Sequence, residues 1–367
     1  MPLELLDRPG AAAEPASSRQ LTFAQALNEA VDQCMARDPS VYLMGLGAPD
    51  PKGIFGSTNG LQSKHGAARV FDMPASENAM TGVAIGSALV GMRPVMSHQR
   101  VDFALLAIEQ IVNQAAKWHY MFAGQASVPM VVRMIVGRGW GQGPQHSQSL
   151  QSWFAHVPGL KVVMPATPHD AKGLLVASIE DNNPVIFIEH RWLHNISGLV
   201  PEDLYRVPLG QARVAKEGSD LTIAATSYMT IEALKAASVL EGAGVHAEVV
   251  DLRSIRPLDE ELILSSVRKT GRLIVADTGW RTAGVAAEVV ARVTEEALPA
   301  LKAAPRRITL PECPAPTTAA LANDYYPRPS DIVAAAWEML GLPESTRPAV
   351  EEPERLDVPD VSFTGPF

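Results

Sequence analysis

The sequence predicts an α/β protein built from two parallel-sheet domains in succession. Strand-length apolar runs alternate with helix-length amphipathic stretches, and most of these runs are apolar on both faces. The alternation pauses once, at a stretch rich in Gly and Pro, and then resumes. With 367 residues, of which 47% are hydrophobic and 19% charged, the chain is long enough for two hydrophobic cores.

The first alternating series predicts a domain over residues 21–195. Expected strands cover 41–47, 94–98, 128–137, 160–166 and 184–190, and expected helices cover 78–90, 103–121 and 169–181. Residues 196–218 contain few long apolar runs and several Gly and Pro residues, so they form the expected linker.

The second series predicts a smaller domain over residues 219–341. Expected strands cover 220–226, 246–252, 272–279 and 306–312, and helices are expected up to 240 and over 259–269, 284–297 and 330–340. Residues 1–20 are expected to form a flexible arm. Five prolines exclude a long helix from residues 342–367, which are expected to be an extended tail that docks on a partner through Phe363 and Phe367.

Charge and composition argue against several classes of protein. The formal net charge is −9 and no stripe of Lys and Arg stands out, which argues against binding to nucleic acid or to an anionic membrane. No run of about 20 apolar residues and no signal pattern is found, so a cytoplasmic location is expected. Cys34 and Cys313 form no CxxC pair and are expected to be buried small hydrophobes.

Three short patterns are poor matches to known ligand motifs. Gly45 and Gly47 lack the third glycine of a dinucleotide site, and the glycine-rich loop 137–143 lacks the Lys-Ser/Thr ending of a P-loop. That loop has the shape expected for close approach by a ligand or another chain. His190 and His194 have helical metal-ligand spacing but no accompanying Glu, so structural or surface histidines are favoured.

Three features remain as candidates for chemistry: Glu77 at the start of an expected helix, the string HQRVDF at 98–103, and PQHSQS at 144–149. Each alone has a simple structural explanation. Glu77 would stabilise a helix N-terminus, Phe103 would be a core residue, and His146 would cap or lie in a loop.

Together, these features and several long strings resemble the beta subunits of pyruvate and branched-chain 2-oxo acid dehydrogenases, which are transketolase-like thiamine enzymes. The matching strings are FDMPASENAMTGVAIGSALVGMRPV, AIEQIVNQAAKWHYMFAG, QHSQSLQSWFAHVPGLKVVMPATPHDAKGLL, SIEDNNPVIFIEH and EVVDLRSIRPLD. The resemblance runs from about Leu21 to Leu340. It implies a transketolase-like pyrimidine-binding domain followed by a transketolase C-terminal-like domain.

The resemblance implies that three residues bind thiamine diphosphate and that a fourth acts on the substrate. Glu77 matches the glutamate that hydrogen-bonds the pyrimidine ring and activates the cofactor. Phe103 matches the aromatic residue that stacks on the pyrimidine, and Gln99 matches a nearby glutamine of the branched-chain relatives. His146 matches the histidine that handles the substrate carboxylate and acyl transfer.

The resemblance also implies metal ions and a partner. A structural potassium ion would be bound largely by backbone carbonyls around Met130, Ser178, Ile179, Asp181 and Asn183, although a plain helix C-terminus explains the same loop. The chain has no Gly-Asp-Gly motif, so the Mg²⁺ that holds the diphosphate would be bound by an alpha-type subunit. The expected assembly is a heterotetramer of two alpha and two beta chains.

The sequence departs from the family at Leu46, at Arg100 and in the long tail. Arg100 is expected either to bind an anionic substrate or to form a salt bridge with the partner chain. Two functions are therefore considered: a dehydrogenase subunit that passes an acyl group to lipoamide on a lipoyl acyltransferase, and a stand-alone acyl or ketol transferase. A non-catalytic homologue is disfavoured because Glu77, Phe103 and His146 are all present.

Overall fold

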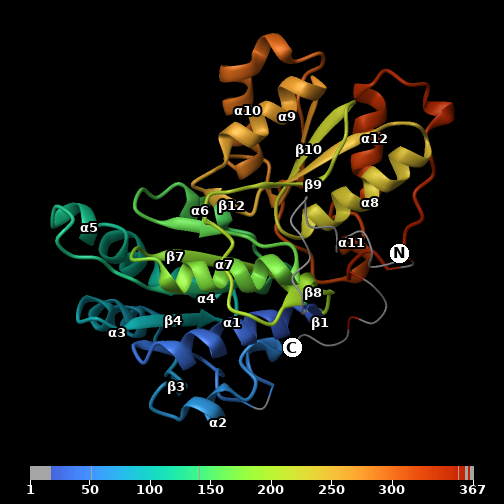
Figure 1. Ribbon diagram of the computed structural model, residues 1–367. Coiled ribbons are helices and arrows are strands. Elements are labelled where there is room, and N and C mark those ends of the chain that lie inside the picture. The colour runs from blue at the N-terminus through green and yellow to red at the C-terminus, as the bar shows by residue number, and fades with distance from the viewer. Residues whose placement is uncertain (1–17, 51, 140, 354, 360–362, 364–367) are drawn as a thin grey trace.

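The computed structural model describes residues 18–50, 52–139, 141–353, 355–359 and 363. It confirms the two predicted α/β domains, which form the lower and upper lobes in Figure 1. Each domain contains one mostly parallel sheet with helices on both faces. The chain crosses from the lower lobe to the upper lobe after residue 201 and returns in its last part.

The N-terminal domain is organised around a seven-stranded sheet in the order β12-β6-β7-β5-β4-β2-β3. Its strands are β2 (Val41–Gly45), β3 (Val70–Phe71), β4 (Arg93–His98), β5 (Val131–Val136), β6 (Lys161–Val163), β7 (Val185–His190) and β12 (Ser254–Arg256). All pairs are parallel except β12 with β6. Because β12 comes from the second half of the chain, this sheet itself ties the two domains together.

Helices cover the two faces of this sheet. The α-helices are α1 (Phe23–Arg37), α2 (Leu61–His65), α3 (Glu77–Leu89), α4 (Val101–Ala104), α5 (Trp118–Met121), α6 (Gln151–Ala155) and α7 (Pro168–Glu180). Short 3-10 or π turns are η2 (Ile54–Gly56), η3 (Leu105–Ala107), η4 (Gln110–Ala115), η5 (Pro144–His146) and η6 (Arg191–Leu193). Strand residues alternate between the faces: Leu43 packs in the core with α1 and α7, and its neighbour Met44 packs in the core with α3.

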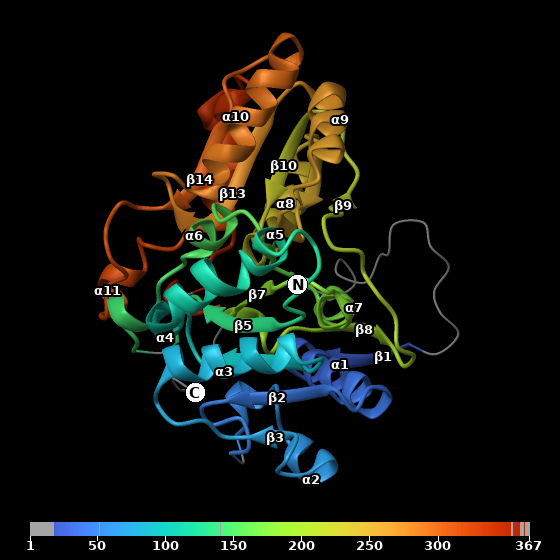
Figure 2. The ribbon, with the colours of Figure 1, turned by 90° about the vertical axis from the view of Figure 1, so that its left-hand side faces the viewer.

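The C-terminal domain has a five-stranded sheet in the order β14-β13-β10-β11-β9, in which only β9 is antiparallel. Its strands are β9 (Arg213–Lys216), β10 (Leu221–Ala225), β11 (Ala247–Asp251), β13 (Leu273–Trp280) and β14 (Arg306–Leu310). Its helices and turns are α8 (Tyr228–Gly242), α9 (Glu260–Thr270), α10 (Val285–Ala297), η7 (Leu298–Ala300), α11 (Ala319–Ala322), α12 (Pro329–Met339) and η8 (Glu344–Thr346). Figure 2 shows α9 and α10 side by side over this sheet.

Several expectations need correction. Residues 18–20 belong to β1 (Ser18–Thr22), which pairs with β8 (Ser197–Pro201), so these three residues are not part of a flexible arm and the linker contains strands. Residues 1–17 of the expected arm lie outside the described residues. The expected helix over 103–121 is divided into α4, η3, η4 and α5, with 3-10 and π turns that change which side chains face the core. Cys34 is buried as predicted, but Cys313 is exposed.

The tail also differs from its expectation. Apart from η8, the described residues after α12 form no helix or strand, in agreement with an extended segment. Phe363, however, is buried against this chain's own Arg191, so it is not available to a partner. Phe367 lies outside the described residues.

A buried set of ion pairs joins the two domains. Asp170 on α7 lies 2.7 Å from Nη2 of Arg253 and 3.4 Å from Nε of Arg213, and Arg213 also lies 3.5 Å from Asp251. Burial would raise the pKa of Asp170, but the two arginines lower it well below its usual range. The pair of arginines therefore depends on Asp170 for compensation of charge.

Replacing this acid tests the junction. Asp170→Asn leaves Arg213 and Arg253 buried with less compensating charge, so the free energy of unfolding at pH 7 should fall by about 3–5 kcal/mol. Urea unfolding measures it, and Glu288→Gln, at an exposed pair with Arg292, is the control that should change little.

The same variant has an expected pH dependence. Because the pKa of Asp170 is lowered on folding, its contribution is complete above the ordinary value of 3.8 and is lost as the pH falls below it. The difference between wild type and Asp170→Asn should therefore shrink at acidic pH. An equal difference at pH 7 and pH 3 would contradict the assignment.

Candidate active site

The candidate residues gather where the parallel strands of the N-terminal sheet end. Strands β2, β4, β5 and β7 run in the same direction, so the loops that follow them meet at one edge. Such carboxyl edges are the usual ligand sites of parallel α/β sheets. The loops carry Gly47, the segment Gln99–Phe103, the segment 137–146 and Arg191.

Glu77 is the first residue of α3 and is 8% exposed. Its carboxylate has no hydrogen-bond or ion-pair partner within the described part of the chain, and only the helix N-terminus favours its charge. Keeping an acid nearly buried without a partner costs free energy, which is typical of a group that meets its partner in a ligand.

The structure brings Phe103 and His146 together. Their rings meet edge to face, with centroids 5.4 Å apart and planes at 80°. Nε2 of Gln148 donates to Oδ1 of Asp102 at 2.8 Å and so ties the segment after η5 to α4. The two rings therefore hold each other at the edge of the sheet, about half buried.

Gln99 is bound to the turn that follows β2. Its Nε2 donates to the carbonyl of Leu46 at 3.1 Å. Gly47 has φ +75°, and a Cβ there would lie 3.0 Å from the same nitrogen. This close approach requires glycine, so the first GxG pair serves the turn beside Gln99.

Arg100 lies inside the chain and is 2% exposed. Its guanidinium donates to the carbonyl of Gly137 and to Oε1 of Gln142, while its Nε has no partner in the described residues. Burial, together with nearby Arg191, lowers the pKa of Arg100 to about 10. The substrate role and the salt bridge to another chain both remain predictions.

Arg191 was missed in the sequence. Its guanidinium carbon lies 4.7 Å from the ring centroid of Phe55 and 4.8 Å from that of Phe363. Burial lowers the pKa of Arg191 to about 10. No hydrogen bond or ion pair reaches its guanidinium from the residues that the structure describes. The available signal was a cation directly after a strand that is apolar on both faces.

His190 and His194, the pair considered for metal spacing, are both core residues. Nδ1 of His190 accepts from the backbone N–H of Trp192 at 3.2 Å. His194 lies 3.2 Å from the carboxylate of Glu189. Burial lowers the pKa of His190 to about 3 and also lowers the pKa of His194. These are structural histidines, as expected.

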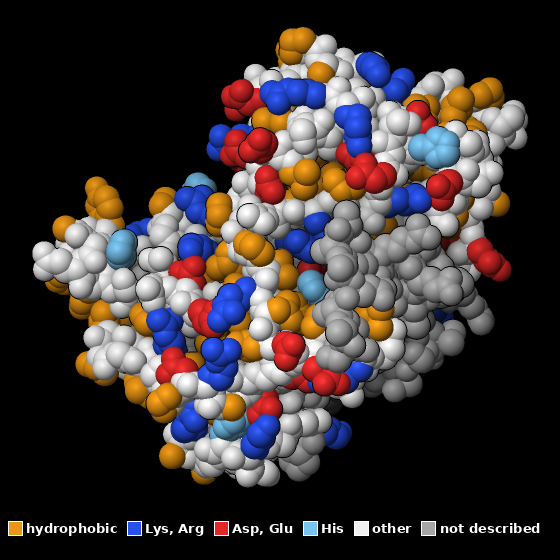
Figure 3. All heavy atoms as spheres, viewed as in Figure 1, with side chains coloured by type: hydrophobic (Ala, Val, Ile, Leu, Met, Phe, Trp, Pro, Cys, Tyr) orange, Lys and Arg blue, Asp and Glu red, His pale blue; other side chains and the backbone are white. Residues whose placement is uncertain are grey.

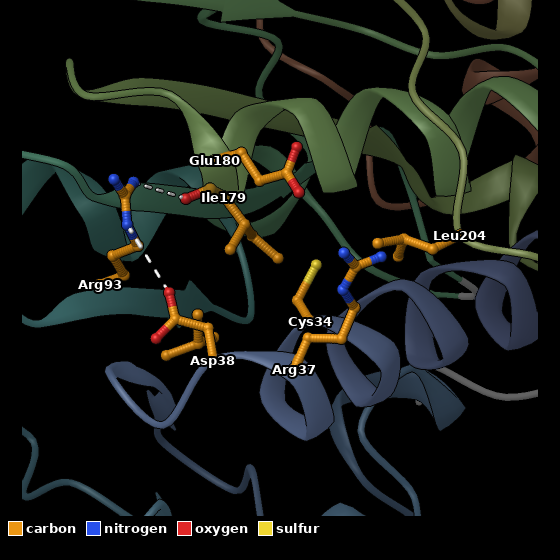
Figure 4. A pocket seen from close by; sticks show the side chains of 8 residues that line it. Cys34, Arg37, Asp38, Arg93, Ile179, Glu180 and Leu204 are labelled. Atoms are coloured by element: carbon orange, nitrogen blue, oxygen red, sulfur yellow. Dashed lines mark hydrogen bonds and ion pairs between the residues drawn. The ribbon is translucent and has the colours of Figure 1, made fainter.

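The turn after α7 does gather around a positive charge. Nη1 of Arg93 donates to the carbonyls of Ile179 and Asp181, each at 3.0 Å, and Figure 4 shows the first of these contacts. Lys161 pairs with the carboxylate of Asp181. The guanidinium thus reaches two of the carbonyls expected to bind potassium.

The other three residues expected around the potassium ion, Met130, Ser178 and Asn183, form hydrogen bonds with other residues of this chain. The hydroxyl of Ser178 donates to Leu174 at 2.7 Å, and the carbonyl of Met130 accepts from Val185 at 2.9 Å. The backbone N–H of Asn183 donates to Oδ1 of Asp181 at 2.8 Å. Met130 and Ser178 are buried.

The described residues contain neither a cluster of metal ligands nor a helix that could span a membrane. No three His, Cys, Asp or Glu side chains among them are grouped so that they would hold a metal ion. Within the same residues, every helix is too short or too polar to cross a membrane.

Comparison with known proteins covers both domains. Residues 19–195 match the transketolase pyrimidine-binding domain, and residues 210–332 match the transketolase C-terminal domain. A solved structure, a split-gene transketolase described as an inactive beta4 tetramer, has a TM-score of 0.72 and 27% sequence identity, and covers 88% of this chain and 99% of its own.

Curated relatives are more similar in sequence. The beta subunit of the acetoin:2,6-dichlorophenolindophenol oxidoreductase of Cupriavidus necator is 44% identical over 87% of this chain and 97% of its own. The mitochondrial pyruvate dehydrogenase E1 component subunit beta-2 of Oryza sativa is 43% identical over 89% and 88%. These relatives favour the dehydrogenase over the transferase. The chain belongs to the family of beta subunits of thiamine-diphosphate-dependent 2-oxo acid dehydrogenases, built from the pyrimidine-binding and C-terminal domains of transketolase.

Proposed function

We propose that the chain is the beta subunit of a thiamine-diphosphate-dependent 2-oxo acid dehydrogenase that passes an acyl group to lipoamide on a lipoyl acyltransferase. The observation that carries the proposal is Glu77, a nearly buried carboxylate that has no partner among the described residues and lies at the carboxyl edge of the pyrimidine-binding domain. The names of the relatives support the class of reaction and include both pyruvate and acetoin as donors.

The residues at this edge fit the pyrimidine half of the cofactor. When bound, thiamine diphosphate would supply a nucleophilic thiazolium carbon for addition to the carbonyl carbon of the substrate. Glu77 would hold a proton at a pyrimidine ring nitrogen, since a carboxyl group both donates and accepts a proton. The ring of Phe103 would stack on the pyrimidine, and Gln99 would line the site beside the turn at Leu46.

His146 would act on the substrate. Its ring packs edge to face with the ring of Phe103, so it lies beside the residue assigned to the pyrimidine. An imidazole there would donate a hydrogen bond to the substrate carboxylate and move a proton during acyl transfer. Arg100 would add a fixed positive charge behind it that favours an anionic substrate.

The diphosphate half of the site would come from an alpha-type subunit, which would hold Mg²⁺ in a heterotetramer of two alpha and two beta chains. Exposed large apolar residues occur on α3, η3, α5 and α6, namely Val83, Leu106, Tyr120, Met121 and Trp153. α5 lies at the left edge of Figure 3, where apolar side chains reach the surface. Apolar surface of this kind supports a protein partner on that side.

The role of Glu77 in activating the cofactor is tested by substitution. In the complex with the alpha-type subunit, Glu77→Gln should lower turnover by about 10²-fold or more while assembly is retained, because an amide does not relay the proton. Proton exchange at the thiazolium carbon, followed by NMR, measures the step directly. Glu217→Gln, at a side chain that is 80% exposed, is the control. Near-normal exchange in Glu77→Gln would show that another group activates the cofactor.

The identity of the acyl acceptor is tested with a lipoyl domain. Incubated with the alpha-type subunit, a 2-oxo acid and a lipoyl domain from the same organism, the chain should yield an acylated lipoyl domain detectable by mass spectrometry. The chain alone should yield none, because the Mg²⁺ ligands are assigned to the partner. Consumption of the 2-oxo acid with dichlorophenolindophenol but without acylation of the domain would overturn the lipoamide assignment.

Potassium would be bound by carbonyls around Ile179 and Asp181, beside Arg93. A carbonyl oxygen has two lone pairs, so a carbonyl that accepts from Arg93 still has a ligand position to offer. Potassium at 100 times its dissociation constant should stabilise the fold by about 2.7 kcal/mol. Thermal melts in KCl and choline chloride at equal ionic strength measure the effect. Identical melting temperatures would show that Arg93 and Lys161 supply all the positive charge.

A further inference from the structure

Residues 355–359 and Phe363, the described residues nearest the C-terminus, lie against the candidate active site. In Figure 1 the red segment after α12 leaves the C-terminal domain and runs toward the N-terminal domain. The family model of the C-terminal domain ends at residue 332, and the Cupriavidus necator relative is covered over 97% of its length by 87% of this chain. The segment lies beyond the part that defines the family domain.

The central contact of this segment is an ion pair between Asp357 and Arg138. The atoms Oδ2 and Nη1 lie 3.2 Å apart, and the two side chains are 2% and 1% exposed. Arg138 belongs to the loop 137–143 that joins β5 to η5, and η5 ends at His146. A residue of the tail thus compensates the charge of a buried cation in the loop that carries His146.

Arg138 in turn fixes the loop. Its Nε donates to the carbonyl of Gln142 at 3.2 Å, and its Nη2 donates to the carbonyl of Thr317. Oε1 of Gln142 accepts from the backbone N–H of Gly139 at 3.0 Å and from Arg100. Hydrogen bonds therefore join Arg138 and Gly139 to Gln142 across the loop. Asp357 compensates the positive charge of Arg138, the donor of one of these bonds.

Further contacts hold the tail in place. Arg328 donates to the carbonyls of Leu356 and Val358, the second at 3.0 Å, and the backbone N–H of Leu356 donates to Oδ1 of Asn323 at 3.2 Å. Val358 is buried, and Phe363 packs on Arg191 at the same edge of the sheet. Asp357 is thus presented to Arg138 by a segment fixed on both sides.

We propose that Asp357 is a positioning residue for His146, and that residues 355–359 and Phe363 form a strap that holds the loop 137–143 in its working geometry. This inference rests on the proposed role of His146 in acyl transfer. Removing the charge of Asp357 leaves Arg138 buried against carbonyl oxygens alone, so the loop relaxes and the imidazole moves. Since His146 acts on the reacting groups, the loss is expected in kcat more than in KM.

The test is a double-mutant cycle in the complex with the alpha-type subunit. Asp357→Asn, nearly isosteric, should lower kcat for acylation of a lipoyl domain by about 10- to 100-fold with KM for the 2-oxo acid nearly unchanged. In a His146→Ala background the same change should have little further effect, because the imidazole that it displaces is already absent. Glu351→Gln, at an exposed residue of the same tail, is the control.

Two other readouts separate a positioning role from general loss of structure. Trypsin should cut after Arg138 in Asp357→Asn and not in wild type, since the ion pair hides this bond, and Asp357→Glu should restore protection and most of kcat. Equal losses from Asp357→Asn with and without His146, or a wild-type kcat, would overturn the strap. Full activity of His146→Ala would instead remove the proposed role of His146, and the positioning proposal with it.

Discussion

Buried arginines at the carboxyl edge of the N-terminal sheet set the constraint on which the rest of the site depends. Arg100, Arg133, Arg138 and Arg191 are all nearly inaccessible to solvent. A buried cation without compensation is costly, so each requires an acid, a carbonyl or an aromatic face. The loops at this edge take the conformations that supply those groups.

The four arginines are satisfied in different ways, and the differences locate the function. Arg133 on β5 pairs with Glu189 on the adjacent β7 at 2.7 Å, which fixes the sheet below the site. Arg138 takes its acid from the tail. Arg100 and Arg191 have carbonyl, amide and phenyl neighbours, and neither forms an ion pair with an acid among the described residues, although the charge of Asp102 acts on Arg100. Positive charge therefore increases from the sheet toward the loops, where an anionic substrate would arrive.

Periodicity predicted most of the scaffold because it is written in local sequence. The apolar strands and α3 were placed within a few residues, and Glu77 fell at the start of its helix as predicted. The helix α1 was missed although Thr22 and Gln25 form a capping box before it. The strands β9 and β12 are four and three residues long, and pairing with distant strands decides them.

The contacts that organise the site had no local signal. Asp357 and Arg138 are 219 residues apart in sequence, and no local sequence pattern around either residue predicts that they pair. The tail looked like an arm for a partner because prolines exclude a helix, and prolines equally allow an extended segment to pack on its own chain. The family resemblance predicted a role for His146 but carried no information on what holds its loop.

The nearly buried Glu77 and the exposed apolar residues of this chain have one physical explanation. Glu77 has no partner among the described residues, and apolar residues on α3 and α5 are exposed. A site completed across an interface would account for both, because the acid would meet its partner in the cofactor and the apolar residues would meet the second subunit. Buried ion pairs between the domains and the strap from the tail hold this half of the site through contacts within the chain. In the proposed assembly the partner would supply the diphosphate site against this edge, and these contacts would lower the cost of ordering the edge on association.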